Sequence, residues 1–170
     1  MGKNCCIKAC LVGDNEVGKT AMVMSYKVNK FLGDYVPTAY DIYAVETQFN
    51  GRNLCINIMD LSGGDGFAKM RAIAYRGTQV FIMCFSLTNR ASFENVRAKW
   101  RPELGAIAPR APIVLVGTKA DLKSKGAAVS DGEARSMASQ IGAFAYVECS
   151  TLTQQGLRAV FDAACQAARR

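Results

Sequence analysis

The sequence predicts an α/β fold, in which a mostly parallel sheet is covered by helices on both faces and carries one antiparallel strand at its edge. Short apolar runs alternate with helical segments along the chain. The runs are continuously apolar, as in strands that are buried on both faces. One pair of strands is separated only by Asn50-Gly51, a dipeptide typical of a tight hairpin turn. Ligands of such sheets bind beyond the carboxyl ends of the strands.

Each element rests on a local pattern. Residues 43–49 alternate between the two faces of a strand, and Ser130 with Glu133 forms a capping box that begins a helix. The predicted strands span residues 6–12, 43–49, 54–61, 80–87, 113–116 and 145–149. The predicted helices span residues 20–29, 93–106, from Ser130 to near Gly142, and 157–168.

Length and composition exclude several classes of protein. The 170 residues suit a single domain, which we expect to span residues 1–170. No apolar run is long enough for a transmembrane helix, and the start of the chain does not resemble a secretory signal. The chain has seven cysteines, no histidine and no C-x-x-C pair. We therefore expect reduced thiols in a cytoplasmic protein rather than a zinc site or a disulfide framework.

The net charge of +7 suits an anionic partner, such as a nucleotide, a nucleic acid or an anionic membrane. The basic residues are scattered, however, and no run of five like charges occurs. We interpret most of them as a solvated surface and expect no nucleic-acid partner.

The strongest motif directly follows the first predicted strand and begins the first helix. It fits the pattern G-x-x-x-x-G-K-[ST], which cradles phosphates with backbone N–H groups. In this pattern the lysine reaches the β- and γ-phosphates and the hydroxyl holds Mg²⁺. The residues are Gly13, Asp14, Asn15, Glu16, Val17, Gly18, Lys19 and Thr20.

A second motif, Asp60-Leu61-Ser62-Gly63, ends the strand over residues 54–61. An aspartate at this place can hold Mg²⁺, usually through water, and the glycine N–H can meet a γ-phosphate. The motif is weak alone, but it gains weight some 40 residues after the phosphate loop.

Two further motifs point to guanine. In Thr118-Lys119-Ala120-Asp121 the carboxylate can accept two hydrogen bonds from guanine, a pattern that adenine does not offer. The stem of Lys119 can lie over the purine ring. A backbone N–H of Cys149-Ser150-Thr151 can reach the purine oxygen. The expected cofactors are thus GTP or GDP with Mg²⁺.

In this order and spacing, the motifs resemble those of a Ras-superfamily small GTPase, and within that superfamily the Rho/Rac family. Residues 35–41, Tyr-Val-Pro-Thr-Ala-Tyr-Asp, are similar to the Rho-type first switch. Residues 80–87 and 91–100 are close to Rac. The resemblance covers residues 5–168 and implies the P-loop small-GTPase fold, with six strands and about five helices.

The resemblance also implies roles for the first switch and for partner proteins. Phe31 would pack against guanine, Tyr35 would cover the phosphates, and Thr38 would join Thr20 and Asp60 at Mg²⁺. The implied partners are effectors, exchange factors and GAP-type proteins, bound by a monomer. The effector face would comprise Tyr35, Val36, Pro37, Thr38, Ala39, Tyr40, Asp41, Ile42 and Tyr43.

Three departures from the family affect catalysis. Gly64 stands where the family has the glutamine that orients the attacking water. Asn15 replaces a glycine and should crowd the space that an arginine finger needs. Glu16 places a carboxylate beside the phosphates, which predicts weaker nucleotide binding and faster exchange. Hydrolysis of GTP is therefore expected to be slow or defective.

Other departures affect mobility and partners. Gly63, Gly64 and Gly66 predict a mobile second switch, since each glycine costs extra entropy to order. The extra helix of the Rho family is absent between Asp121 and Ser130. The end of the chain shows neither a prenylation box nor a polybasic tail, so no membrane anchor is visible.

Four functions remain open at this point. The first is a Rho-like switch with poor hydrolysis, and the second is a non-cycling guanine-nucleotide-binding module or decoy for Rho regulators. The third is a competent GTPase to which a partner supplies the missing group. The fourth, a P-loop kinase of small molecules, conflicts with the guanine motif at residues 118–121.

Overall fold

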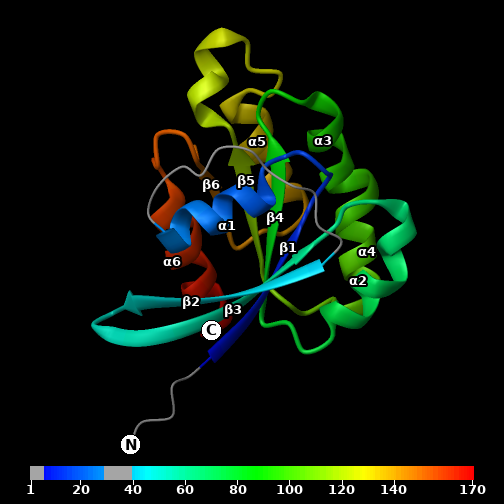
Figure 1. The fold of residues 1–170 in the computed structure, drawn as a ribbon. Helices are drawn as coiled ribbons and strands as arrows, with labels where there is room; N and C mark the ends of the chain where they lie inside the picture. Colours follow the sequence, from blue (N-terminus) through cyan, green and yellow to red (C-terminus); the bar gives the residue numbers. More distant parts are fainter. Residues whose placement is uncertain (1–5, 29–39) are drawn as a thin grey trace, which may run out of the picture.

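The computed structural model describes residues 6–28 and 40–170, which form one six-stranded sheet with helices on both faces (Figure 1). The strand order is β2-β3-β1-β4-β5-β6, and β2–β3 is the antiparallel pair while the other neighbours are parallel. This confirms the predicted fold class. The strands are β1 (Cys6–Val12), β2 (Tyr40–Phe49), β3 (Arg52–Leu61), β4 (Val80–Ser86), β5 (Ile113–Thr118) and β6 (Ala145–Glu148).

The helices differ from the prediction in two places. Six α-helices occur in the described residues: α1 (Lys19–Val28), α2 (Ala68–Tyr75), α3 (Arg90–Asn95), α4 (Arg101–Ile107), α5 (Asp131–Gln140) and α6 (Leu157–Ala168). Helix α2 has no counterpart among the elements predicted from local pattern. The predicted helix at 93–106 is divided into α3 and α4 by a π-helical segment, η2 (Val96–Trp100). When α3, η2 and α4 are counted as one continuous rod, the described residues contain five helices, the number expected.

The π-helical segment has a local cause. The N–H of Arg101 bonds to the carbonyl of Val96, five residues back, instead of four. Pro102 has no N–H for the carbonyl of Ala98, and its ring crowds that carbonyl, which favours a wider turn. Two short 3₁₀ helices complete the fold, η1 (Asp65–Phe67) and η3 (Ala120–Lys125).

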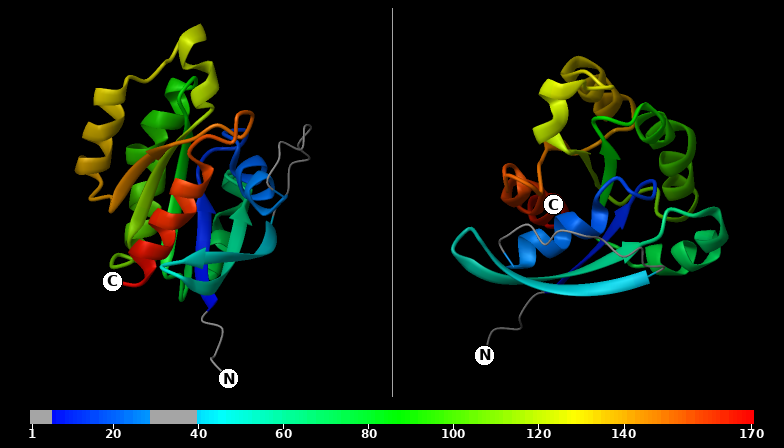
Figure 2. Two further views of the ribbon diagram at one scale, coloured as in Figure 1. Left: turned by 90° about the vertical axis from the view of Figure 1, so that its left-hand side faces the viewer. Right: turned by 45° about the horizontal axis from the view of Figure 1, so that its top comes forward.

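Two apolar cores lie on opposite faces of the sheet, because successive side chains of a strand point to opposite sides. Ala9 and Leu11 of β1 belong to the core beneath α1 and α6, and Cys10 and Val12 belong to the other. The second core is covered by α2, the α3–α4 rod and α5, and Figure 2 shows the two helical layers. All seven residues of the central strand β4 are buried.

Two predictions from the sequence concern the state of the cysteines and the presence of a transmembrane helix. The six described cysteines are free thiols, and four of them are buried. Among residues 6–28 and 40–170, no helix is long and apolar enough to cross a membrane.

Candidate functional site

The phosphate loop connects β1 to α1 at the carboxyl edge of the sheet. Gly13 has φ 146°, and a Cβ there would lie 2.2 Å from the carbonyl oxygen of Cys84, so only glycine fits. Gly18 also has a positive φ, of 100°. The loop leads directly into α1, whose first N–H groups have no helical partner and are therefore suited to bind an anion.

Lys19 lies beneath this loop and is almost completely buried, with 7% of its surface exposed. Its Nζ donates to the carbonyl oxygens of Gly13 at 2.9 Å and Asp14 at 2.7 Å. Burial lowers the pKa of the ammonium group, since desolvation disfavours the charged form. A bound phosphate would oppose that shift, so the loop holds a cation where an anionic ligand would be stabilised.

Thr20 and Asp60 form the neighbouring part of the site. The Thr20 hydroxyl donates to the Asp60 carboxylate, and both residues are buried. Burial raises the pKa of Asp60, while the Thr20 hydrogen bond and the Lys19 charge oppose the rise. A hydroxyl and a carboxylate are hard oxygen ligands, and Mg²⁺ characteristically combines one or two carboxylates with phosphate oxygens and water. The pair therefore fits Mg²⁺, although the described part of the chain contains no cluster of three acidic or thiol ligands.

The guanine motif is assembled by contacts between three loops. The Thr118 hydroxyl donates to the carbonyl oxygens of Val17 at 2.5 Å and Phe85 at 3.0 Å, which ties the end of β5 to the phosphate loop. Lys119 adopts a left-handed conformation with φ 60°, and its Nζ donates to the Glu16 carbonyl at 3.0 Å. The structure thus brings the two predicted motifs together.

The loop after β6 contributes more than the backbone N–H that the sequence suggested. The Ser150 hydroxyl donates to the Asp121 carboxylate at 2.7 Å, and the Ala120 N–H bonds to the Cys149 carbonyl at 3.0 Å. Ser150 therefore orients the carboxylate that was predicted to recognise guanine. Thr151 continues the same loop.

The side chains of Asn15 and Glu16 differ in the contacts that they make within the described residues. The Asn15 side-chain oxygen accepts the N–H of Gly63 at 2.8 Å and the hydroxyl of Ser62 at 3.4 Å, so this loop residue reaches across to the second switch. Glu16 has φ 66°, an uncommon conformation for a residue other than glycine, and its side chain is exposed. It makes no ion pair with the residues that the structure describes.

The second switch, residues 62–66, is held by several backbone hydrogen bonds in this structure, and the mobility that its glycines predict stays a prediction. Arg71 donates to the carbonyl oxygens of Ser62 at 2.8 Å and Gly64 at 2.6 Å. Lys99 donates to the Gly63 carbonyl at 2.8 Å and pairs with Asp65 at 2.9 Å. Cations on α2 and η2 thus bind the backbone carbonyls of residues 62–64, which the glycine pattern does not indicate.

These cations belong to a network that the sequence analysis missed. Glu103 pairs with Arg71 at 2.8 Å and accepts the Tyr75 hydroxyl at 2.5 Å. The Trp100 ring lies under both cations, 5.0 Å from Arg71 Cζ and 4.5 Å from Lys99 Nζ. Such contacts stabilise a cation over an indole face.

The same rod holds the phosphate loop. Trp100 Nε1 and Asn95 Nδ2 donate to the two carboxylate oxygens of Asp14, at 2.8 Å and 2.7 Å. A signal for this was present in the sequence, because Asn95, Lys99 and Glu103 recur every four residues and so share one helix face.

Part of the predicted site lies outside the described residues, namely Phe31, Tyr35, Val36, Pro37, Thr38 and Ala39. The rest of the predicted effector face lies on β2, which begins at Tyr40. Ile42 is half exposed, and the Tyr43 hydroxyl donates to Asp41 at 3.3 Å.

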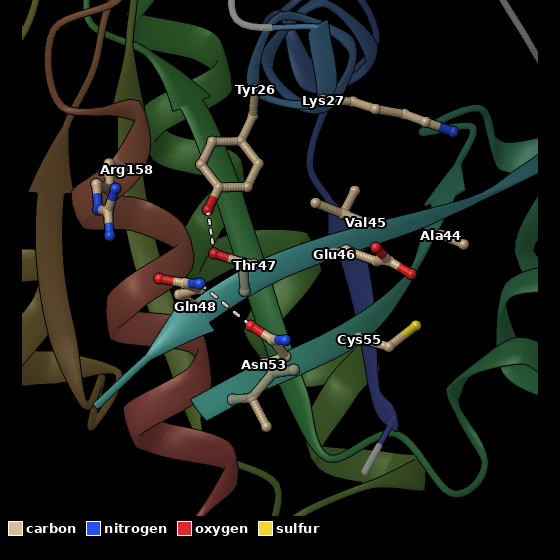
Figure 3. Close-up of a pocket in the computed structure, with 11 residues that line it drawn as sticks. Tyr26, Lys27, Ala44, Val45, Glu46, Thr47, Gln48, Asn53, Cys55 and Arg158 are labelled. Atoms are coloured by element: carbon tan, nitrogen blue, oxygen red, sulfur yellow. Dashed lines mark hydrogen bonds between the residues drawn. The ribbon is translucent and has the colours of Figure 1, made fainter. Parts of the chain in front are cut away.

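A separate open cavity of about 910 Å³ lies between α1, the β2–β3 hairpin and α6 (Figure 3). Its polar wall includes the hydrogen bonds from Tyr26 to Thr47, at 2.8 Å, and from Gln48 to Asn53, at 3.2 Å. None of its lining residues belongs to the phosphate loop or the guanine motif, so it is not the nucleotide site.

The fold and the phosphate loop define a P-loop nucleotide-binding protein. The model of the Ras family matches residues 8–170, almost the entire chain. The chain belongs to the Ras family, and it is a small GTPase domain, a GTP-binding switch. Proteins of this family bind GTP or GDP, generally with Mg²⁺, and interact with regulators and effectors.

Proposed function

We propose that this protein is a Rho-like guanine-nucleotide switch with impaired GTP hydrolysis, which presents residues 35–43 to effectors when GTP is bound. The observation that carries the proposal is the surface facing a γ-phosphate. There Gly64 supplies no side chain, and the Asn15 side chain reaches across to Gly63, with its oxygen 2.8 Å from that N–H.

The proposed nucleotide contacts follow from the geometry. Lys19 and the loop N–H groups bind the phosphates, and Asp121, held by Ser150, accepts the two donors of guanine. Thr20 and Asp60 would hold Mg²⁺, which Thr38 would join by resemblance, and the metal would supply positive charge against the phosphates.

Impaired hydrolysis follows from what the site lacks and what it adds. A side chain that orients water must project toward the γ-phosphate, and Gly64 has none. Gly64 has φ −68°, which any residue can adopt, so the backbone does not require glycine at this position. Asn15 stands beside it, where a partner's arginine would have to enter. Both the intrinsic and the stimulated routes are therefore slowed.

The Rho-like assignment rests on residues 35–41, 80–87 and 91–100. The short helix η3 and the five residues that follow it lead directly to α5. Partners that bind the extra helix of the Rho family would find no counterpart between Asp121 and Ser130. We place the protein in the cytoplasm as a monomer.

One observation favours the second candidate, a non-cycling binding module or decoy. Asn15, Arg71 and Lys99 hold the second switch through contacts within the chain. A switch segment that is held in this way has less to gain from a γ-phosphate.

The nucleotide that co-purifies with the full chain tests the proposal. It is released by denaturation and separated by ion exchange against GDP and GTP standards. Mostly GTP supports impaired hydrolysis. Mostly GDP, with rapid single-turnover hydrolysis of added GTP, contradicts it. Equal affinity of an effector for the GDP-bound and analogue-bound forms would favour the binding module instead.

A further inference from the structure

The second switch of a GTPase senses the γ-phosphate through a backbone N–H, and here that N–H belongs to Gly63. In this structure it already has a partner, since the Asn15 side-chain oxygen accepts it at 2.8 Å. An amide oxygen and a phosphate oxygen are both hydrogen-bond acceptors, so they compete for the same donor.

The fit of Gly63 against the phosphate loop is close. A Cβ on Gly63 would lie 2.5 Å from the Gly13 carbonyl oxygen and 2.9 Å from the Asn15 nitrogen. Gly63 is buried in this position. The glycine is therefore docked directly on the loop that holds the phosphates.

The other side of the segment is held as well. Its three successive carbonyls, from Ser62 to Gly64, accept hydrogen bonds from Arg71 and Lys99. Both cations lie over the buried ring of Trp100, whose Nε1 binds Asp14. All these partners come from the chain itself.

We propose that Asn15 is a specificity-determining residue that takes the place of a γ-phosphate oxygen at Gly63. The second switch is then docked with a nucleoside diphosphate as well as with a triphosphate, and the γ-phosphate adds little to affinity there. The inference rests on the proposed function, because it takes Gly63 as the phosphate sensor.

The thermodynamic reason is that a ligand shifts an equilibrium only by its differential affinity for the two states. If the docked state is already populated without a γ-phosphate, GTP cannot populate it further. The exposed side chains of α2 and its N-terminal flank, Phe67, Met70 and Ile73, are then presented to partners in both nucleotide states.

Fluorescence of Trp100 provides the readout, because Trp100 is the single tryptophan of the chain. Its ring lies beneath Arg71 and Lys99, the two cations that bind the second switch. The experiment uses the full chain and compares wild type, Asn15→Ala and Asn15→Asp. Trp100 emission is recorded in the GDP-bound form and with a non-hydrolysable GTP analogue, and both dissociation constants are measured.

The expected wild-type result is the same Trp100 emission with either nucleotide. In Asn15→Ala, emission should differ between the nucleotides, and preference for the analogue should rise about tenfold, as for one hydrogen bond to a charged group. Asn15→Asp keeps the acceptor, so its GDP-bound emission should match wild type.

Wild-type emission that changes with nucleotide as it does in Asn15→Ala would overturn the inference. So would an unchanged preference in Asn15→Ala, or an Asn15→Asp form that behaves like Asn15→Ala. Circular dichroism confirms that each variant is folded. Failure of guanine nucleotides to bind any form would instead overturn the proposed function, and the inference with it.

Discussion

The two ends of the candidate site differ in the functional side chains that they contain. The end formed by Lys19, Thr20 and the loops after β5 and β6 has the side chains that nucleotide binding requires, in mutual contact. The end formed by residues 62–65 lacks a water-orienting side chain and is bound by the chain's own amide and cations. We infer from this difference that holding a nucleotide and responding to it are separable properties of this fold.

The largest effect is expected from Lys19→Ala, which breaks the binding end. The variant removes a buried cation that faces the phosphate loop, so nucleotide affinity should fall by about 10²–10⁴-fold, the worth of two hydrogen bonds to charged groups. Isothermal titration with GDP measures it. Lys27→Ala, an exposed lysine of the same helix, is the control. Retained affinity in Lys19→Ala would show that the binding end was misassigned.

Next in size is Glu103→Ala, which acts at the second-switch end. It leaves the guanidinium of Arg71, a residue only 1% exposed, without its carboxylate partner. Breaking a buried ion pair in this way costs about 3–5 kcal/mol of the free energy of unfolding, measurable by urea denaturation. Glu94→Ala removes two exposed ion pairs, with Arg90 and Arg97, and should cost at most about 1 kcal/mol. Equal losses in the two variants would show that the network adds no stability.

A smaller loss is expected from Asp121→Asn, which tests whether the binding end is specific for guanine. An amide presents a donor where guanine offers its own donors, so GDP affinity should fall by about 100-fold. Fluorescence titration with a labelled GDP measures it. Asp131→Asn changes an exposed carboxylate and should have no effect. A variant with wild-type affinity would place the base elsewhere.

Gly64→Gln adds to the second-switch end the water-orienting side chain that it lacks. Gly64 has φ −68°, and the atom nearest to a Cβ added there would be in the Phe67 side chain, at 3.4 Å. The site therefore has room for a side chain. Single-turnover hydrolysis should rise by about tenfold, less than the ~10²–10⁴-fold typical of a positioned catalytic group, because Asn15 remains. Gly66→Gln, two residues on, serves as the matched control. A rate that stays at the wild-type value would make Asn15, and not Gly64, the dominant obstacle.

The smallest effect lies outside both ends, at the capping box of α5. A hydrogen bond from the Ser130 N–H lowers the pKa of Glu133 to about 2 from its usual 4.5, and a hydrogen bond from Arg90 is the second cause. The stabilisation is therefore present above pH 4.5 and is lost as the pH falls toward 2. Thermal unfolding of wild type and Glu133→Gln should differ at pH 6 and converge near pH 2. A difference that is independent of pH would contradict this.

The sequence predicted the fold well because each buried strand is a continuous apolar run between turn signals. The phosphate and guanine motifs were found because each is a local pattern of residues. The boundaries of β2 were less clear, since its first residues do not alternate strictly, and η2 depends on a proline acting on the preceding turn.

The network around Trp100 was missed for a different reason. The four-residue spacing places Asn95, Lys99 and Glu103 on one helix face. It does not show that this face meets Asp14 and Arg71, which lie far away in the sequence. The glycines at 63, 64 and 66 predict mobility from their local entropy, and the bonds that oppose it join residues far apart in the sequence. The mobility itself stays a prediction.

The π-helical segment between α3 and α4 has a consequence for how this chain tolerates insertions and deletions. A π segment amounts to one extra residue within an α-helix, and each residue of an α-helix turns the chain by about 100°. Deleting one residue between Val96 and Trp100 would let the wide turn close into an ordinary helix, so the residues on either side would keep their orientation. Glu103 would still meet Arg71, and Asn95 would still face Asp14. A deletion of one codon in this segment would thus preserve the link between the phosphate loop and the second switch, whereas a deletion within an ordinary α-helix such as α6 turns everything after it by about 100°.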